Sequence, residues 1–307
     1  MAAILAPVRR YHARFPASVM KTSESLFLEV RGLRYHVRRW GPPEGRTVFL
    51  LHGWMDVSAS FQFVVDALRG QWRVLAPDWR GYGLTHWTSA DSYWYPDYFA
   101  DLDRLLDHFQ PEDPVNLVGH SMGGNVGCLY AGSRPHRVRK LVNLEGLGMR
   151  DPPAEEAPGR YARWLEELRR PQSLRDYASF DELAARLRSH NPRLSESRAQ
   201  FLARHWGGER NGRVALRSDP RHKIVNPTLY RAHEAMACLR AITAPVLWVE
   251  GAESDLPGRA RISPEALAER KACIKNLREA VIPGAGHMIH HDQPERLAQL
   301  LEEFLAA

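Results

Sequence analysis

The chain has 307 residues, of which 44% are hydrophobic and 25% charged, a balance typical of one large or two small globular domains. Its 42 Lys and Arg residues against 36 Asp and Glu residues give a net charge of +6, and no apolar run approaches the ~18 residues of a membrane span. Its three cysteines are too few for a disulfide framework and lack the CxxC spacing of a structural zinc site, so composition favours a cytoplasmic protein.

The basic charge gathers in residues 1–40 and 150–240, each with a net charge of +6. Residues 1–25 are predicted to be a basic N-terminal extension, since Arg9, Arg10 and Arg14 precede the first acid, Glu24. This pattern is also typical of a transit peptide, so organellar targeting is an alternative. In the middle segment the basic residues alternate with acids, which is typical of solvated helices and not of a nucleic-acid footprint. We therefore expect no nucleic-acid partner.

Strand and helix patterns alternate before residue 146 and after residue 244. Leu26–Val30 and Arg34–Trp40 are predicted strands joined by a turn at Arg31 and Gly32. The alternation that follows predicts an α/β protein with a mostly parallel, doubly wound sheet. The further predicted strands are Val48–Leu51, Val74–Ala76, Val115–Val118, Leu141–Leu144, Pro245–Val249 and Ala280–Ile282, and the predicted helices are Ser60–Leu68 (with Ser60 as N-cap), Pro96–Phe109, Asn125–Ala131 and Glu295–Leu305.

The segment between these halves is predicted to be a helical insertion. It contains helical patterns at Ala162–Leu168, Phe180–Leu187 and Ser195–His205, without a buried-strand run. The predicted domains are therefore a core of residues 26–149 and 241–307 and a cap of residues 150–240.

The candidate nucleophile is Ser121, in the segment Gly119–Gly123 between a predicted strand and helix. A serine at such a turn needs strained backbone angles, and small residues two positions before and after it let the chain fold tightly. The helix that follows places its N-terminus beside any negative charge that develops. This pattern is typical of a catalytic serine.

A serine hydroxyl needs a base, and His287 is the candidate. It lies in the loop Pro283–His287, after the last predicted strand and before the last helix, at the edge of the sheet where catalytic groups gather. His290 and His291 lie beyond the glycine turn and are interpreted as supporting residues.

A carboxylate should orient the imidazole, and two candidates follow neighbouring strands. Asp255 comes just after the strand that ends at Val249, and Glu145 comes directly after the strand that ends at Leu144. Asp255 is favoured and Glu145 is the alternative; Glu253 is a weaker third option.

An oxyanion needs two backbone N–H donors. We expect one at Met122, the residue after the nucleophile, and the other at Trp54 in the early loop. The side chain of Trp54 could also line an acyl pocket. His52, Gly53 and His120 flank these groups and are predicted to bind substrate.

Together these residues resemble the α/β-hydrolase superfamily, in the order nucleophile, acid, base. The resemblance implies that the insertion after the sixth strand is a cap, and the chain looks closest to serine-hydrolase-like and carboxylesterase-type members. In the family the acid usually stands where this chain has Ser254, one residue before Asp255; the haloalkane-dehalogenase branch places it after the sixth strand, where Glu145 stands. The matching segments are His52–Trp54, Asp78–Gly83, Gly119–Gly123, Gly251–Asp255 and Gly284–His287.

The expected function is a serine hydrolase, a carboxylesterase that cleaves small to medium esters through an acyl-enzyme, with a small-molecule ester as partner. No metal or organic cofactor is expected. The same triad would also serve C–C bond hydrolysis, thioester hydrolysis or perhydrolase chemistry. The alternative from another class is a non-catalytic binding protein, because fold does not decide function.

Overall fold

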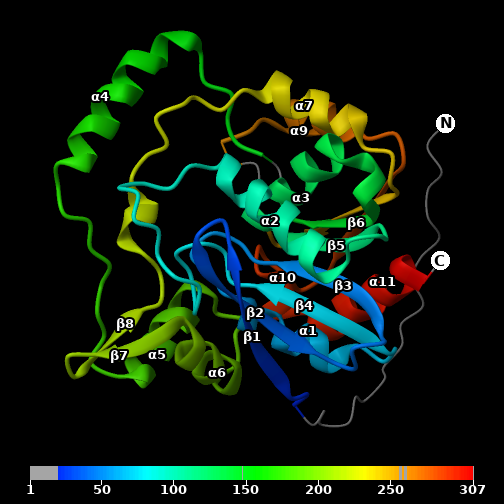
Figure 1. Ribbon diagram of the computed structural model, residues 1–307, viewed down its shortest axis with the longest axis horizontal. Coiled ribbons are helices and arrows are strands. Elements are labelled where there is room, and N and C mark those ends of the chain that lie inside the picture. The colour runs from blue at the N-terminus through cyan, green and yellow to red at the C-terminus, as the bar shows by residue number, and fades with distance from the viewer. Residues whose placement is uncertain (1–19, 147, 256–257, 259–260, 307) are drawn as a thin grey trace.

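The computed structural model describes residues 20–146, 148–255, 258 and 261–306. Most of the predicted basic extension, including Arg9, Arg10 and Arg14, therefore lies outside the described residues. Figure 1 shows how the helices and strands of these residues are arranged.

The centre of the molecule is an eight-stranded sheet with the order β1-β2-β4-β3-β5-β6-β9-β10. The β1–β2 and β2–β4 pairs are antiparallel, and every other pair is parallel. This confirms the predicted fold class. The strands are β1 (Ser23–Val30), β2 (Leu33–Trp40), β3 (Arg46–Leu51), β4 (Trp72–Pro77), β5 (Val115–His120), β6 (Val138–Leu144), β9 (Val246–Gly251) and β10 (Leu277–Ile282).

Local chemistry explains the two kinds of strand. The β1–β2 hairpin turns at Arg31 and Gly32, which both have positive φ, as a tight two-residue turn requires. All six residues of β5 are buried, and no polar alternation is seen, because a central parallel strand is covered on both faces.

Helices cover both faces of the sheet, each over its own apolar core (Figure 1). One core receives side chains from α2, α3, α7 and α9, and the other receives them from α1 and α11. The helices are α1 (Gln62–Ala67), α2 (Pro96–Phe109), α3 (Met122–Ser133), α4 (Ala157–Leu168), α5 (Phe180–His190), α6 (Glu196–Trp206), α7 (Ala232–Ala241), α9 (Pro264–Ala272), α10 (Ile289–Asp292) and α11 (Pro294–Ala306), with 3-10 turns η1 (Ser58–Phe61), η2 (Pro135–Arg137), η3 (Ala154–Glu156) and η4 (Pro220–Lys223).

The segment between β6 and β9 forms the insertion, as predicted. Helices α5 and α6 and a hairpin of β7 (Gly207–Arg210) and β8 (Arg213–Leu216) share an apolar cluster of their own. Helix α4 stands apart from these elements in Figure 1, and none of its residues is buried. The boundaries of the cap, residues 150–240, stay a prediction.

One local expectation needs correction. Ser60 does not cap α1, because it lies inside the 3-10 turn Ser58–Phe61 that precedes this helix, and its hydroxyl donates to Asp56. Helices α7 and α9 and the hairpin of the insertion were not predicted. Their sequences bury few apolar side chains, so the periodic signal is weak.

Candidate active site

Ser121 lies at a sharp turn between β5 and α3, where the sequence predicts it. Its backbone has φ 51° and ψ −112°, a conformation that costs a non-glycine residue free energy and is retained mainly at functional sites. Its N–H donates to the carbonyl of Leu144 (2.8 Å), and its carbonyl accepts the N–H of Asn125 (3.0 Å). The turn is therefore fixed on both sides, to β6 and to α3.

The glycines around Ser121 are required by close backbone contacts. A Cβ atom on Gly119 would lie 2.4 Å from the carbonyl oxygen of Gly123, and one on Gly123 would lie 2.1 Å from that of Leu51. Both distances are far inside van der Waals contact. The predicted reason for the glycine spacing is thus confirmed by the geometry.

His287 lies in the loop after β10 and contacts Glu145 and His120. Its Nδ1 is 3.1 Å from Oε2 of Glu145, and its backbone carbonyl accepts a hydrogen bond from Nε2 of His120 (2.9 Å). Since a carboxylate only accepts, a neutral His287 carries its proton on Nδ1 and presents an unprotonated Nε2. This is the tautomer that a general base needs.

Glu145 directly follows β6 and is held by two hydrogen bonds besides the one to His287. Its Oε1 accepts the N–H of Gly251 (2.7 Å), and its Oε2 accepts the hydroxyl of Ser254 (2.6 Å). The side chain is fully buried, and the backbone φ is 59°. The carboxylate is thus fixed in position by donors from β9 and the loop after it.

The preference for Asp255 over Glu145 is corrected by this arrangement. Asp255 is exposed, and its carboxylate accepts the N–H of Gly258 (3.2 Å). The third option, Glu253, pairs with Arg193 of the insertion. Strand order places Glu145 next to Ser121, because β6 is paired with β5. The hydrogen bonds from Gly251 and Ser254 then direct its carboxylate to Nδ1 of His287, although β9 separates β6 from β10.

The two predicted oxyanion donors lie on either side of Ser121. Met122 is the first residue of α3, and first-turn N–H groups have no acceptor within their helix. Gly53 packs directly on the nucleophile, because a Cβ on it would be 3.3 Å from Cβ of Ser121. The side chain of Trp54 is 55% exposed and does not form part of the core.

His52 and His120 support these loops and are themselves buried. Nε2 of His52 accepts the N–H of Trp79, so its Nδ1–H donates to the carbonyl of Gly53 (2.8 Å). Burial lowers the pKa of both histidines, and the nearby His290 and His287 lower that of His120 further. Both are therefore neutral and brace the loops, which corrects the prediction that they contact substrate.

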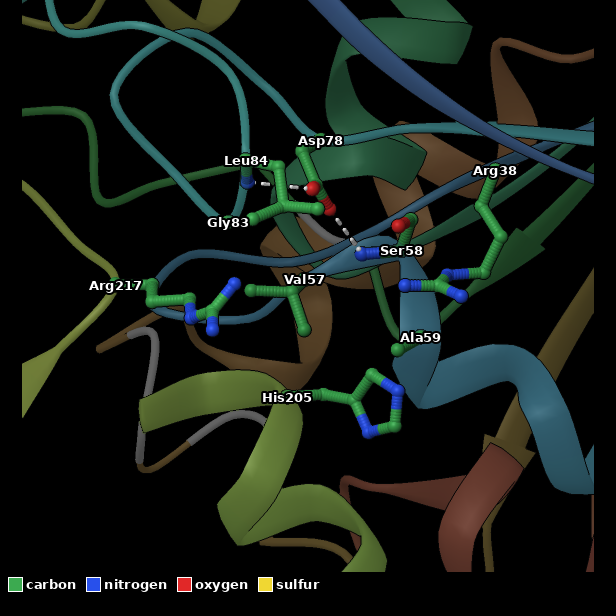
Figure 2. A pocket seen from close by; sticks show the side chains of 9 residues that line it. All are labelled: Arg38, Val57, Ser58, Ala59, Asp78, Gly83, Leu84, His205 and Arg217. Carbon is green, nitrogen blue, oxygen red and sulfur yellow. Dashed lines mark hydrogen bonds between the residues drawn. The ribbon is translucent and has the colours of Figure 1, made fainter. Parts of the chain in front are cut away.

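A small polar cavity of about 20 Å³ lies where the insertion meets the core (Figure 2). Asp78 lines this cavity, and its carboxylate accepts the N–H groups of Ser58 (2.7 Å) and Leu84 (2.9 Å). The other charged or polar side chains of the lining include those of Arg38, His205 and Arg217. The space fits about one water molecule, so it is too small for an ester. It serves packing and not substrate binding.

The insertion reaches the base loop through Asp292 of α10. One oxygen of this carboxylate accepts the side-chain amide of Asn191 (2.7 Å), and the other accepts the N–H of Gly286 (2.9 Å), the residue before His287. The position of the base is therefore tied to the insertion. No sequence pattern pointed to this link.

We expect Asp292→Ala to lower kcat/KM for an ester by roughly 10- to 100-fold, because a base displaced by about 1 Å loses its alignment. The matched control is Asp181→Ala, which removes a similar carboxylate–amide bond, to Gln200, inside the insertion alone. Steady-state kinetics of both variants check this. Equal effects of the two substitutions would contradict a role of Asp292 in positioning His287.

Comparisons with known proteins agree with this geometry. A family model described as the alpha/beta hydrolase fold matches residues 46–294. A serine hydrolase-like protein of Danio rerio is 26% identical over 283 residues, which cover 87% of this chain and 83% of that protein. A 3-hydroxybutyrate-oligomer hydrolase of Cupriavidus necator is 30% identical over 290 residues, covering 90% of this chain and 93% of that protein.

A solved structure extends the comparison to three dimensions. The thioesterase domain from the curacin biosynthetic pathway superposes with a TM-score of 0.82 at 26% identity, over 91% of this chain and 99% of that one. Among the described residues of this chain, no helix is both long and apolar enough to cross a bilayer.

Proposed function

We propose that this chain, which belongs to the α/β-hydrolase fold family, is a serine hydrolase that cleaves carboxylic esters with Ser121, His287 and Glu145. The relatives described above are named as a hydrolase and a hydrolase-like protein. The observation that carries the proposal is the pairing of His287 with the buried Glu145 next to a strained serine. A binding protein has no need for this combination, because strain and a buried carboxylate both cost stability.

Backbone contacts support a common site for the three residues. Ser121 donates its N–H to Leu144, the residue before Glu145, and His120, the residue before Ser121, donates to the carbonyl of His287. One hydrogen bond therefore links Ser121 to the residue before Glu145, and a second links the residue before Ser121 to His287. These links support the proposal that Ser121, His287 and Glu145 act together as a triad.

The proposed reaction has two halves. Nε2 of His287 takes the proton from Ser121 as Oγ attacks the ester carbonyl, and Glu145 stabilises the imidazolium that forms. The imidazolium then gives its proton to the leaving alcohol, and Ser121 keeps the acyl group. Water next attacks the acyl carbon, His287 takes a proton from it and returns that proton to Ser121, and the carboxylic acid leaves.

The oxyanion of each tetrahedral intermediate is assigned to the N–H groups of Met122 and Trp54. The hydrogen bond from His52 holds the carbonyl of Gly53. The C=O and N–H of one trans peptide point in opposite directions, so the N–H of Trp54 points away from His52. With Gly53 packed on Ser121, this orientation supports Trp54 as the second donor.

Two relatives bear on the bond that is cleaved. The relative with 30% identity is named for the hydrolysis of 3-hydroxybutyrate oligomers, and this favours an ester substrate. The structural neighbour is a thioesterase domain, so thioester hydrolysis is the second candidate. A panel of p-nitrophenyl esters and acyl thioesters, each with graded chain length, distinguishes the two by kcat/KM.

The first test is covalent labelling with a fluorophosphonate probe, with the adduct mapped by peptide mass spectrometry. We expect one adduct on Ser121 and none in Ser121→Ala, because only an activated serine reacts quickly with the probe. Ser133→Ala is the matched control, since Ser133 ends the same helix and its hydroxyl donates to Leu129. A folded wild-type protein that stays unlabelled would favour the binding-protein reading.

A further inference from the structure

A buried cluster of Asp56, His290 and His291 lies outside the proposed triad. Asp56 follows the oxyanion loop, and the two histidines form part of α10, behind the base loop. Their exposed fractions are 2%, 0% and 3%, and their ligand atoms all lie within 4.8 Å of one another. The cluster therefore joins two loops that the reaction needs.

The cluster contains polar atoms without hydrogen-bond partners among the described residues. They are Oδ2 of Asp56, both ring nitrogens of His290 and Nε2 of His291. Nε2 of His290 and Oδ2 of Asp56 are 3.5 Å apart, beyond a normal hydrogen bond. Buried polar atoms of native proteins are nearly always satisfied, so an occupant between these atoms would complete their bonding.

The side chains of the cluster are of the types that bind metals. The carboxylate of Asp56 and the imidazoles of His290 and His291 each offer one ligand atom. A carboxylate binds a metal when it is ionised, and an imidazole binds one when it is neutral.

Surrounding groups orient the carboxylate. Oδ1 of Asp56 accepts the N–H of Val57 (2.8 Å) and the hydroxyl of Ser60, which leaves Oδ2 directed at the histidines. Ser60 in turn accepts Nε1 of Trp206 from the insertion (3.0 Å). Metal-binding carboxylates are held in this way by their neighbours.

We propose that Asp56, His290 and His291 form a binding site for one transition-metal dication, with Zn²⁺ as the best match. Two imidazole nitrogens and one carboxylate oxygen are a ligand set that zinc prefers, whereas Ca²⁺ and Mg²⁺ prefer oxygen alone. Tetrahedral zinc with bonds of about 2.0–2.1 Å separates its ligand atoms by roughly 3.3 Å. The 3.5 Å between Asp56 and His290 is close to this value.

The site is structural and not part of the triad. The ring of His120 lies between the cluster and the base, 4.4 Å from the ring of His290 and 4.8 Å from that of His287. The metal would connect the loop after β3 to α10 and so hold the oxyanion loop against the base loop. Because all three ligands are buried, we expect the metal to enter during folding.

The test measures metal binding directly, on the full chain without a histidine tag. The protein is refolded from denaturant with ZnCl₂ or with EDTA, dialysed, and analysed for zinc by mass spectrometry and for thermal stability. We expect about one Zn²⁺ per chain and a rise in Tm of at least about 5 °C over the EDTA sample. Refolding with Co²⁺ should give the visible absorption of a tetrahedral site.

Variants locate the site. Asp56→Asn and His291→Gln should each lose the zinc and the cobalt absorption. The matched control is His36→Gln, since His36 also pairs with a buried aspartate, Asp78 (2.7 Å), yet lies outside the cluster; it should keep both signals. A folded wild type that retains no zinc and shows no cobalt absorption would overturn the proposal, and the cluster would then be a direct ion pair or a water site. The zinc content and the cobalt absorption report on this cluster alone, whereas labelling of Ser121 tests the proposed hydrolase function.

Discussion

Glu145→Gln is expected to lower kcat for an ester by ~10³–10⁴-fold while leaving the protein folded. The N–H of Gly251 donates to Oε1 of Glu145, so the amide oxygen of a glutamine must occupy that place. Its NH₂ group then takes the place of Oε2 and faces Nδ1 of His287. Because this NH₂ group is a donor, Nδ1 becomes the acceptor and the proton of His287 moves to Nε2. A protonated Nε2 cannot take the proton from Ser121.

The matched control is Asp255→Asn, which should stay within about twofold of the wild type, since the Asp255 carboxylate is exposed and bonded to Gly258. Both variants are measured by steady-state kinetics on one ester, with circular dichroism and Tm as checks of folding. The opposite outcome, a large loss in Asp255→Asn and none in Glu145→Gln, would mean that the base takes its partner from the loop after β9.

The nucleophile could be predicted from sequence because its constraints are local. The glycines at 119 and 123 are needed by backbone contacts within a few residues of Ser121, or with the neighbouring strand β3. The strand before and the helix after it carry clear patterns of their own. The residues that identify Ser121 as the candidate nucleophile therefore lie within one short segment of the sequence.

The acid could not be chosen from local signals, because the choice depends on strand order and side-chain reach. Several loops leave the sheet at the same edge, and the sequence does not say which carboxylate meets His287. One signal was present: the family resemblance implies an acid where this chain has Ser254. In the structure the hydroxyl of Ser254 donates to Glu145, so this position supports the carboxylate of Glu145.

Other misses have different causes. The hairpin of β7 and β8 turns at Asn211 and Gly212, both with positive φ, and Asn-Gly is a strong hairpin signal. It was missed because the flanking strands are short and partly polar. Asp56 was missed because its partners, His290 and His291, lie far along the chain and meet it only in the folded protein.

The second large expected effect is a steep loss of stability in mild acid. Burial lowers the pKa of five histidines, in the case of His222 to about 3. The other four are His52, His120, His205 and His291. In the unfolded chain each has an ordinary pKa near 6.5, so the unfolded state binds protons first as the pH falls. Stability is therefore fully present above about pH 6.5 and is lost below it.

The size of the loss follows from linkage. Each such histidine costs about 1.4 kcal/mol per pH unit once the unfolded state is protonated and the folded state is not. His222, with a folded-state pKa of about 3, stays neutral throughout this range, so it alone lowers the free energy of unfolding by about 2 kcal/mol between pH 6.5 and 5, and the other four histidines add to this loss. Against a total stability of about 5–15 kcal/mol this is a large fraction. The lowered pKa values of Asp56 and Asp78 act in the same direction but only below about pH 4.

Urea unfolding at several pH values between 7.5 and 5 measures this slope, and one variant tests its origin. His222 is stacked between Tyr82 and Tyr93, with ring centroids 3.9 and 3.6 Å away, so His222→Phe keeps the stacking and removes the titrating group. We expect the slope to fall by about 1.4 kcal/mol per pH unit, the share of one histidine, whereas the exposed control His136→Phe should leave it unchanged. A free energy of unfolding that stays constant from pH 7 to 5 would show that these histidines accept protons in the folded state. The buried contacts of His52 and His120 would then have to open without unfolding the protein, and activity would be lost in acid before stability.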